Sequence, residues 1–195
     1  MLDASASRGE YQRVIAAQAY VIAEALRACG IPYQIYSFCT LRGYTVMTLY
    51  QSYEEKKKST SVFSYCATGW NRDGLALRGA RVLMGDLTDA KKILVMLTDA
   101  SPNDDHPLYT GKGALSQHEY RDERAVDDTA AEAASLRRDG VRIVGLINDE
   151  IAGSMEDAQK IFGKDLVRVK TLDKMAESVG KACATRFRLL KGRLT

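Results

Sequence analysis

The sequence predicts an α/β fold, with a doubly wound, mostly parallel central sheet and helices on both faces. Stretches with apolar residues at helical spacing alternate with short runs of consecutive apolar residues, a pattern typical of buried parallel strands between helices. The chain has 195 residues and 46% hydrophobic content, enough for one domain with a sizeable core. We therefore expect residues 1–195 to form a single domain.

The first half of the chain predicts two helices that flank a pair of strands. The first helix is indicated by apolar residues at helical spacing between Val14 and Leu26, and Gly30 ends it. Two short apolar runs separated by a short turn then indicate an antiparallel pair whose second strand lies at the sheet edge. In order, we expect a helix over 10–29, strands over 33–38 and 44–49, a solvated loop over 53–60 and a helix over 74–84.

The second half continues the alternation after a buried strand. The polar segment that follows this strand is long compared with ordinary connections of about 4 to 6 residues, so we expect it to be a loop that borders a functional site. Gly140 closes an amphipathic segment, and basic residues near Arg193 complement the dipole of a final helix. The expected elements are a strand over 92–99, the polar loop over 100–121, a helix over 124–139, strands over 141–147 and 166–169 and a helix over 172–190.

Oxygen-bearing side chains occur where these elements meet. Asp3, Ser5 and Ser7 alternate just before the first helix, and Asp99 follows the strand over 92–99. Ligands of open α/β sheets bind at the carboxyl ends of strands, so these oxygens are expected to converge there. A hard cation such as Mg2+ takes about six oxygen ligands, whereas Asp and Ser alone are also common in helix caps and turns.

A third polar segment lies between these two and enters the helix over 74–84. It contains Asn71, whose amide oxygen can coordinate a metal ion or accept a hydrogen bond. Thr68 and Asp73 are close enough in the sequence to take its place. Three loops are therefore expected to meet at one ion.

The motifs Asp3-x-Ser5-x-Ser7, Asn71-Arg-Asp-Gly-Leu-Ala-Leu-Arg and Leu-Thr-Asp99 resemble those of the von Willebrand factor A domain and its metal-ion-dependent adhesion site. The resemblance covers nearly the whole chain. It is closest to the C-terminal domain of nitric oxide reductase activation proteins and the related cobaltochelatase subunit. It implies that Asp3, Ser5, Ser7 and Asp99 are metal ligands, with Asn71 at the position of the family's threonine.

The same resemblance implies a binding function rather than an enzyme. Mg2+ is the expected cofactor, with Mn2+ or Ca2+ as alternatives, and the ion is expected to capture an acidic residue of a protein partner. An AAA+ ATPase and a target metalloenzyme, such as nitric oxide reductase, are the implied partners in activation or maturation.

Two other hypotheses stay open at this point. A Mg2+-dependent phosphohydrolase of the haloacid dehalogenase type would need an acid two positions after Asp3, where this chain has Ser5. A structural domain with a decayed metal site is suggested by Asn71 and by the first strand, which we expect to be truncated because only Met1 and Leu2 precede Asp3. The short start also suggests a C-terminal fragment of a larger protein.

Composition narrows the function classes further. The net charge of +3 without a basic stripe argues against nucleic acid as a partner. The sequence also contains no apolar run long enough to cross a bilayer, which argues against membrane insertion. His106 and His118 are expected to be solvated loop residues. Four scattered cysteines without a C-x-x-C pair indicate small core residues in a cytoplasmic protein, namely Cys29, Cys39, Cys66 and Cys183.

Overall fold

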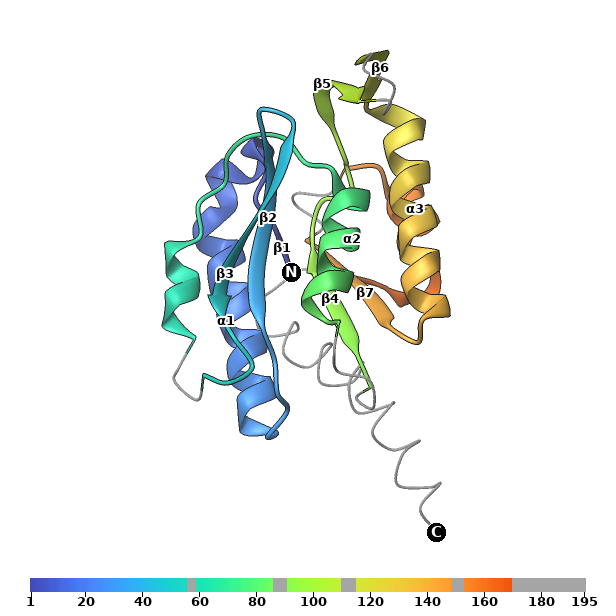
Figure 1. The fold of residues 1–195 in the computed structure, drawn as a ribbon. Coiled ribbons are helices and arrows are strands. Elements are labelled where there is room, and N and C mark those ends of the chain that lie inside the picture. Colours follow the sequence, from blue (N-terminus) through green and yellow to red (C-terminus); the bar gives the residue numbers. More distant parts are fainter. Residues whose placement is uncertain (56–58, 86–90, 110–114, 149–152, 170–195) are drawn as a thin grey trace.

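A six-stranded sheet forms the centre of the protein in a computed structural model that describes residues 1–55, 59–85, 91–109, 115–148 and 153–169 (Figure 1). Its strands are β1 (Leu2–Asp3), β2 (Ile35–Leu41), β3 (Tyr44–Gln51), β4 (Ile93–Leu97), β7 (Arg142–Asn148) and β8 (Leu166–Val169). They lie in the order β3-β2-β1-β4-β7-β8. Only the edge pair β2 and β3 is antiparallel, which confirms the predicted mostly parallel sheet and the predicted edge strand.

Helices cover both faces of this sheet, as the sequence predicts. They are α1 (Gln12–Ala28), α2 (Asp73–Leu83), α3 (Asp122–Arg138) and α4 (Met155–Phe162). Buried residues of α1 pack in one core cluster, and those of α2, α3 and α4 pack in another. Figure 1 shows α1 on one side of the sheet and α2 and α3 on the other.

Side chains of β4 show how one strand serves both cores. Leu94 and Met96 belong to the cluster with α2, α3 and α4, whereas Val95 and Leu97 pack in the cluster with α1. Successive side chains of a strand point to opposite faces, so an unbroken apolar run is what a sheet covered on both faces requires.

The first strand is short but central. Leu2 pairs with Ser37 of β2 on one side and with Leu97 of β4 on the other, and it is 1% exposed. The next residue, Asp3, therefore lies at the carboxyl end of a strand in the interior of the sheet. This position confirms the expectation that the first strand lies inside the sheet and is short.

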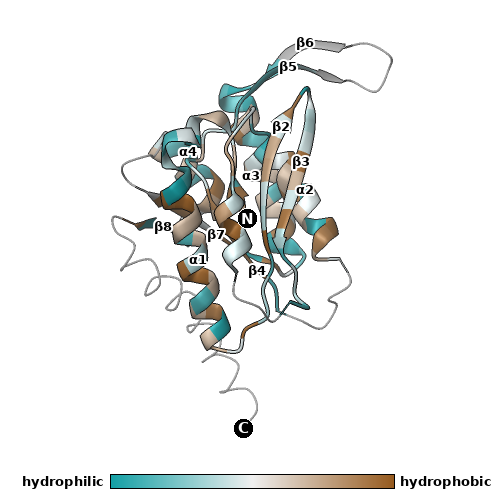
Figure 2. Cartoon of the chain, turned by 90° about the vertical axis from the view of Figure 1, so that its left-hand side faces the viewer, coloured by the Kyte–Doolittle hydropathy of each residue, from teal (hydrophilic) through white to brown (hydrophobic). Residues whose placement is uncertain are grey.

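The polar segment 100–121 corrects the prediction of a loop. It contains a two-stranded antiparallel hairpin of β5 (Asp104–Tyr109) and β6 (Leu115–Tyr120), which projects past the end of the main sheet (Figure 2). The pairing is interrupted by register shifts at Pro107, and such a strand lacks the regular alternation by which strands are recognised. Buried Asp104 and Tyr120 anchor its base.

Helix α4 was absent from the predicted elements. Its eight residues are too few for a clear apolar period, although Ser154 caps its start by accepting a hydrogen bond from Asp157 N at 3.2 Å. The ring of Phe162 packs against the bare backbone of Gly145 in β7, where a Cβ atom would lie 2.4 Å from the ring. This close contact fixes α4 against the sheet.

Several smaller expectations can be compared with the structure. The turn between β2 and β3 is only Arg42 and Gly43, both at positive φ, so the strands run farther than predicted. Cys39 is buried as expected, but Cys29 and Cys66 are exposed because they lie in loops after α1 and after the short helix Thr60–Ser64. The expected helix over 172–190 and Cys183 lie outside the described residues. Among the helices that the structure describes, none has the length and apolar character needed to cross a bilayer.

Candidate metal centre

The carboxyl ends of β1 and β4 bring the two aspartates of the predicted site together. Because these strands are neighbouring and parallel, Asp3 and Asp99 emerge at the same edge of the sheet. Asp3 is 0% exposed and Asp99 is 7% exposed. Thr98, which precedes Asp99, donates a hydrogen bond from its hydroxyl to Asp3 Oδ2 at 3.3 Å and so links the two strand ends.

The two serines connect these aspartates through a series of hydrogen bonds. Ser5 N donates to Asp3 Oδ1 at 2.9 Å, and the hydroxyls of Ser5 and Ser7 lie 3.1 Å apart. Ser7 Oγ in turn donates to Asp99 Oδ2 at 3.3 Å. The structure therefore brings together Asp3, Ser5, Ser7 and Asp99.

Backbone hydrogen bonds hold the third loop beside the first. Thr68 N donates to Ala4 O at 2.7 Å, and Ala6 N donates to Gly69 O at 2.9 Å. Gly69 has a positive φ of 68°, and a Cβ atom there would lie 2.4 Å from Thr40 O. A residue with a side chain would thus be strained at this close approach. Trp70 follows it and is 37% exposed at the same end of the sheet.

Asn71 lies at the edge of this group, and its amide is engaged with protein atoms. Its Nδ2 donates to Asp73 Oδ1 at 2.9 Å and to Ser101 O at 3.3 Å. Its Oδ1 accepts from Asn103 N at 3.3 Å. The amide thereby ties the start of α2 to the segment that leads into the β5–β6 hairpin.

Three residues of the site were not selected from the sequence as its principal members. Arg8 is 2% exposed and forms an ion pair from Nη1 to Asp99 Oδ2 at 3.3 Å. Asp73 is 1% exposed at the first position of α2 and was considered only as a substitute for Asn71. Thr98 is 1% exposed. The adjacency of Arg8 to Ser7 and of Thr98 to Asp99 is the signal that points to them.

Burial and mutual repulsion shift the pKa values of two carboxyl groups. The pKa of Asp3 rises from 3.8 to about 6, first because of burial and then because of the charge of Asp99. The pKa of Asp73 is raised well above its usual value by burial, followed by the charges of Asp3 and Asp99. The site therefore concentrates negative charge in an interior that disfavours it.

These donors fit a hard divalent cation. Carboxylates and hydroxyls from several segments supply oxygen ligands of the type that Mg2+, Mn2+ and Ca2+ accept. Buried carboxylates also need compensation by a cation or by hydrogen bonds, and a divalent ion would provide it. Asp3, Ser5, Ser7 and Asp99 are the residues that would hold the ion.

The raised pKa of Asp3 predicts a pH dependence. Without metal, the folded state holds this proton more tightly than the unfolded state, so the contribution of Asp3 to stability falls as the pH rises from 3.8 to about 6. A bound cation takes the place of the proton. We expect the rise in Tm caused by Mg2+ to be larger at pH 7 than at pH 5. Thermal unfolding with Mg2+ or EDTA checks this, and an equal rise at both values would contradict it.

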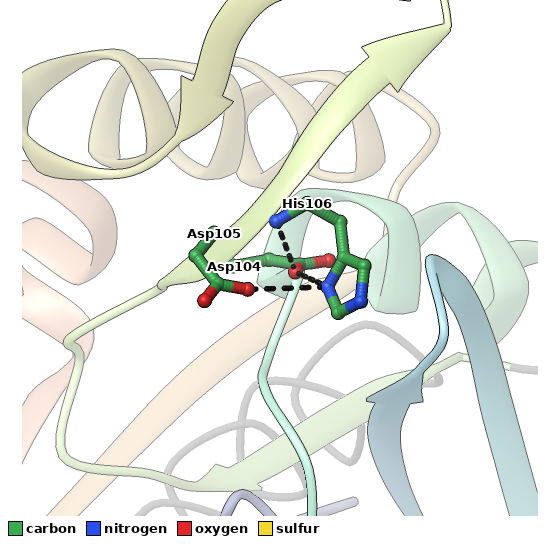
Figure 3. A group of neighbouring side chains, drawn as sticks. All are labelled: Asp104, Asp105 and His106. Carbon is green, nitrogen blue, oxygen red and sulfur yellow. Dashed lines mark hydrogen bonds and ion pairs between the residues drawn. The ribbon is translucent and has the colours of Figure 1, made fainter.

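A second group of potential ligands occurs at the base of the hairpin (Figure 3). Asp104, Asp105 and His106 place their ligand atoms within 4.8 Å of one another. Asp104 is already the buried partner of Arg72, whose Nε lies 2.5 Å from Asp104 Oδ2, and it accepts a hydrogen bond from His106 N at 3.0 Å. We interpret this group as an anchor for the hairpin.

His106 differs from the expected solvated loop residue. Its side chain is 40% exposed, but its Nδ1 lies 2.7 Å from Asp104 Oδ1. The side chain of His118 lies outside the described residues.

The fold and the position of the site define the class of protein. The chain has the fold of von Willebrand factor A domains. The von Willebrand factor domain of the pilus tip protein Mfa5 from Porphyromonas gingivalis superposes with a TM-score of 0.68 at 10% identity, covering 94% of this chain and 92% of that one. Proximal thread matrix protein 1 from the mussel byssus, with a zinc-occupied adhesion motif, gives a TM-score of 0.61 at 16% identity over 93% of this chain and 44% of that one.

A sequence relative adds a more particular similarity. Protein NorD from Stutzerimonas stutzeri is 28% identical over 135 residues, which is 67% of this chain and 20% of that protein. The chain thus spans about a fifth of the length of the curated relative that it matches. No protein-family model matches the sequence.

Proposed function

We propose that this domain binds Mg2+ through Asp3, Ser5, Ser7 and Asp99, and that the bound ion captures a carboxylate of a partner protein. The observation that supports this most is the series of hydrogen bonds that runs from Asp3 through the backbone and hydroxyl of Ser5 and the hydroxyl of Ser7 to Asp99. Asn71, the fifth ligand predicted from the sequence, borders the same site. Mn2+ and Ca2+ accept the same donors and are the alternatives.

The chemistry of the direct donors suits capture of an external ligand. Ser5 and Ser7 contribute neutral hydroxyl oxygens, so they occupy coordination positions without lowering the charge of the ion. Bound Mg2+ would supply a Lewis-acidic centre that accepts one further oxygen ligand. The position two residues after Asp3, where the phosphohydrolase hypothesis requires a second carboxylic acid, is occupied by Ser5. Binding is therefore the function that we propose, rather than catalysis.

The partners belong to the proposal as well. The similarity to NorD supports a role as an adaptor that works in the cytoplasm with an AAA+ ATPase in activating a metalloenzyme such as nitric oxide reductase. The domain would contribute the metal-dependent contact, and an acidic side chain of the ATPase or of the target would complete the coordination.

A pull-down with the full-length protein tests this function. We expect an AAA+ ATPase from the same cells to be captured in Mg2+, and the capture to be lost in EDTA and in the double variant Ser5→Ala/Ser7→Ala. The matched control is Ser61→Ala/Ser64→Ala, because these two serines are exposed and far from the site in the sequence. Capture that persists unchanged in EDTA would contradict a metal-dependent contact.

A further inference from the structure

The third loop contains a buried carboxylate oxygen that the hydrogen bonds of the site leave unused. Asp73 is 1% exposed, and its Oδ2 has no hydrogen-bond partner, whereas its Oδ1 accepts from Asn71 Nδ2 at 2.9 Å. An ionised oxygen that is buried without a partner is costly. It therefore indicates a ligand that this oxygen would bind.

The surroundings of Asp73 show where that ligand would lie. Asp3 and Asp99 are the charged groups with the largest influence on its carboxyl group, and the hydroxyl of Thr98 contributes as well. Thr98 also contacts Asp3 at 3.3 Å. Asp73 is thus part of the same cluster as the two strand-end aspartates.

We propose that Asp73 is a direct ligand of the divalent cation and that Asn71 is the residue that positions it. This inference rests on the proposed function, and it assigns the contribution of the third loop to a carboxylate instead of an amide. The oxygen of Asn71 is engaged with Asn103 N at 3.3 Å, whereas Oδ2 of Asp73 is available.

Charge balance supports this assignment. Among the described residues, the cluster contains the carboxylates of Asp3, Asp73 and Asp99, and Arg8 pairs with Asp99. Three negative charges and one positive charge leave two negative charges uncompensated, and one divalent cation would neutralise them. The bound cation would thereby compensate buried carboxylates that are costly without a counter-charge.

The competing explanation is that Asp73 serves α2 alone. An acid in the first turn stabilises a helix by interacting with its dipole, which is a modest effect of about 0.3 to 1 kcal/mol. That role does not explain why Oδ2 is buried without a partner. The two explanations differ in what the metal-free protein should do when the charge is removed.

Calorimetric titration with Mn2+, together with thermal unfolding in EDTA, separates the explanations. We expect Asp73→Asn to weaken Mn2+ binding at least tenfold, since even residues behind the direct ligands often contribute that much. In EDTA the same variant should have an unchanged or higher Tm, because one charge leaves a repulsive cluster. A helix-only role would instead leave Mn2+ affinity unchanged and lower the Tm.

Two further variants complete the design. Asp73→Ala, which removes every ligand atom of this side chain, should show the same loss of affinity if Asp73→Asn does not fold. Asn71→Ala should lose less Mn2+ affinity than Asp73→Asn, yet lower the metal-free Tm because its bonds to Ser101 and Asn103 disappear. Equal Mn2+ affinity of wild type and Asp73→Asn overturns this inference alone. A wild type that binds no Mn2+ overturns both it and the proposed metal site.

Discussion

Arg72→Ala should destabilise the domain by about 3 to 5 kcal/mol, the range found when one partner of a buried ion pair is removed. Arg72 Nε lies 2.5 Å from Asp104 Oδ2, with side-chain exposures of 10% and 0%, and Nη2 donates to His106 O at 3.3 Å. Without the guanidinium, Asp104 remains buried and negatively charged. Urea unfolding gives the change in the free energy of unfolding.

Arg78→Ala is the matched control, because Arg78 lies on α2, the helix that begins directly after Arg72. It pairs with Asp128 and Glu132, but its side chain is 46% exposed. Exposed ion pairs contribute about 0 to 1 kcal/mol, so this variant should lose far less stability. The double variant Arg72→Met/Asp104→Asn should recover most of the loss, since no buried charge remains. Similar losses for the two single arginine variants would refute the anchoring role.

Asp3→Asn should abolish the stabilisation of the domain by divalent metal. At a metal concentration of about 100 times Kd, a bound ligand stabilises the folded state by about 2.7 kcal/mol, which corresponds to a rise in Tm of roughly 5 to 10 °C for a domain of this size. We expect this rise for the wild type and none for the variant. Thermal unfolding in Mg2+ and in EDTA provides the comparison.

The metal-free behaviour of Asp3→Asn distinguishes a ligand from a structural residue. Because the folded-state pKa of Asp3 is raised to about 6, its ionised form opposes folding at pH 7, so the variant should be at least as stable as the wild type in EDTA. The control Asp105→Asn removes an exposed carboxylate from the other ligand group and should keep the full rise. If Asp105→Asn loses the rise and Asp3→Asn keeps it, the metal binds at the base of the hairpin.

The central part of the fold was predictable because its signals are local and strong. The consecutive apolar residues of β4 and the helical spacing of apolar residues in α1 and α3 are patterns that loops do not usually have. All three elements occur where they were expected. Asp3 and Asp99 could be placed together because parallel strands share a carboxyl edge. Ser5 and Ser7 follow Asp3 closely in the chain, so they were expected at the same edge.

The hairpin and α4 could not be predicted from local patterns. The hairpin depends on the buried contact of Arg72 with Asp104, which joins residues 32 positions apart and has no periodic signature. Helix α4 is held by the contact of Phe162 with Gly145 of strand β7. In both cases tertiary packing supplies the stability that the local sequence does not.

The sequence predicted that Asp3, Ser5, Ser7 and Asp99 would lie together, but it did not predict the electrostatics of the site. Arg8 and Asp73 gain their roles only when the interior excludes water, since burial is the largest cause of the raised pKa of Asp73. No spacing rule indicates which charged residue of a loop will be buried. The pairing of Arg8 with Asp99 likewise joins residues 91 positions apart.

Anomalous diffraction from crystals grown with Mn2+ tests the proposed site most directly. We predict a strong peak within coordinating distance of the carboxylates of Asp3 and Asp99 and of at least one hydroxyl of Ser5 or Ser7. A peak only between Asp104 and His106, or no peak at the carboxyl ends of β1 and β4, would contradict the metal-dependent function proposed for this domain.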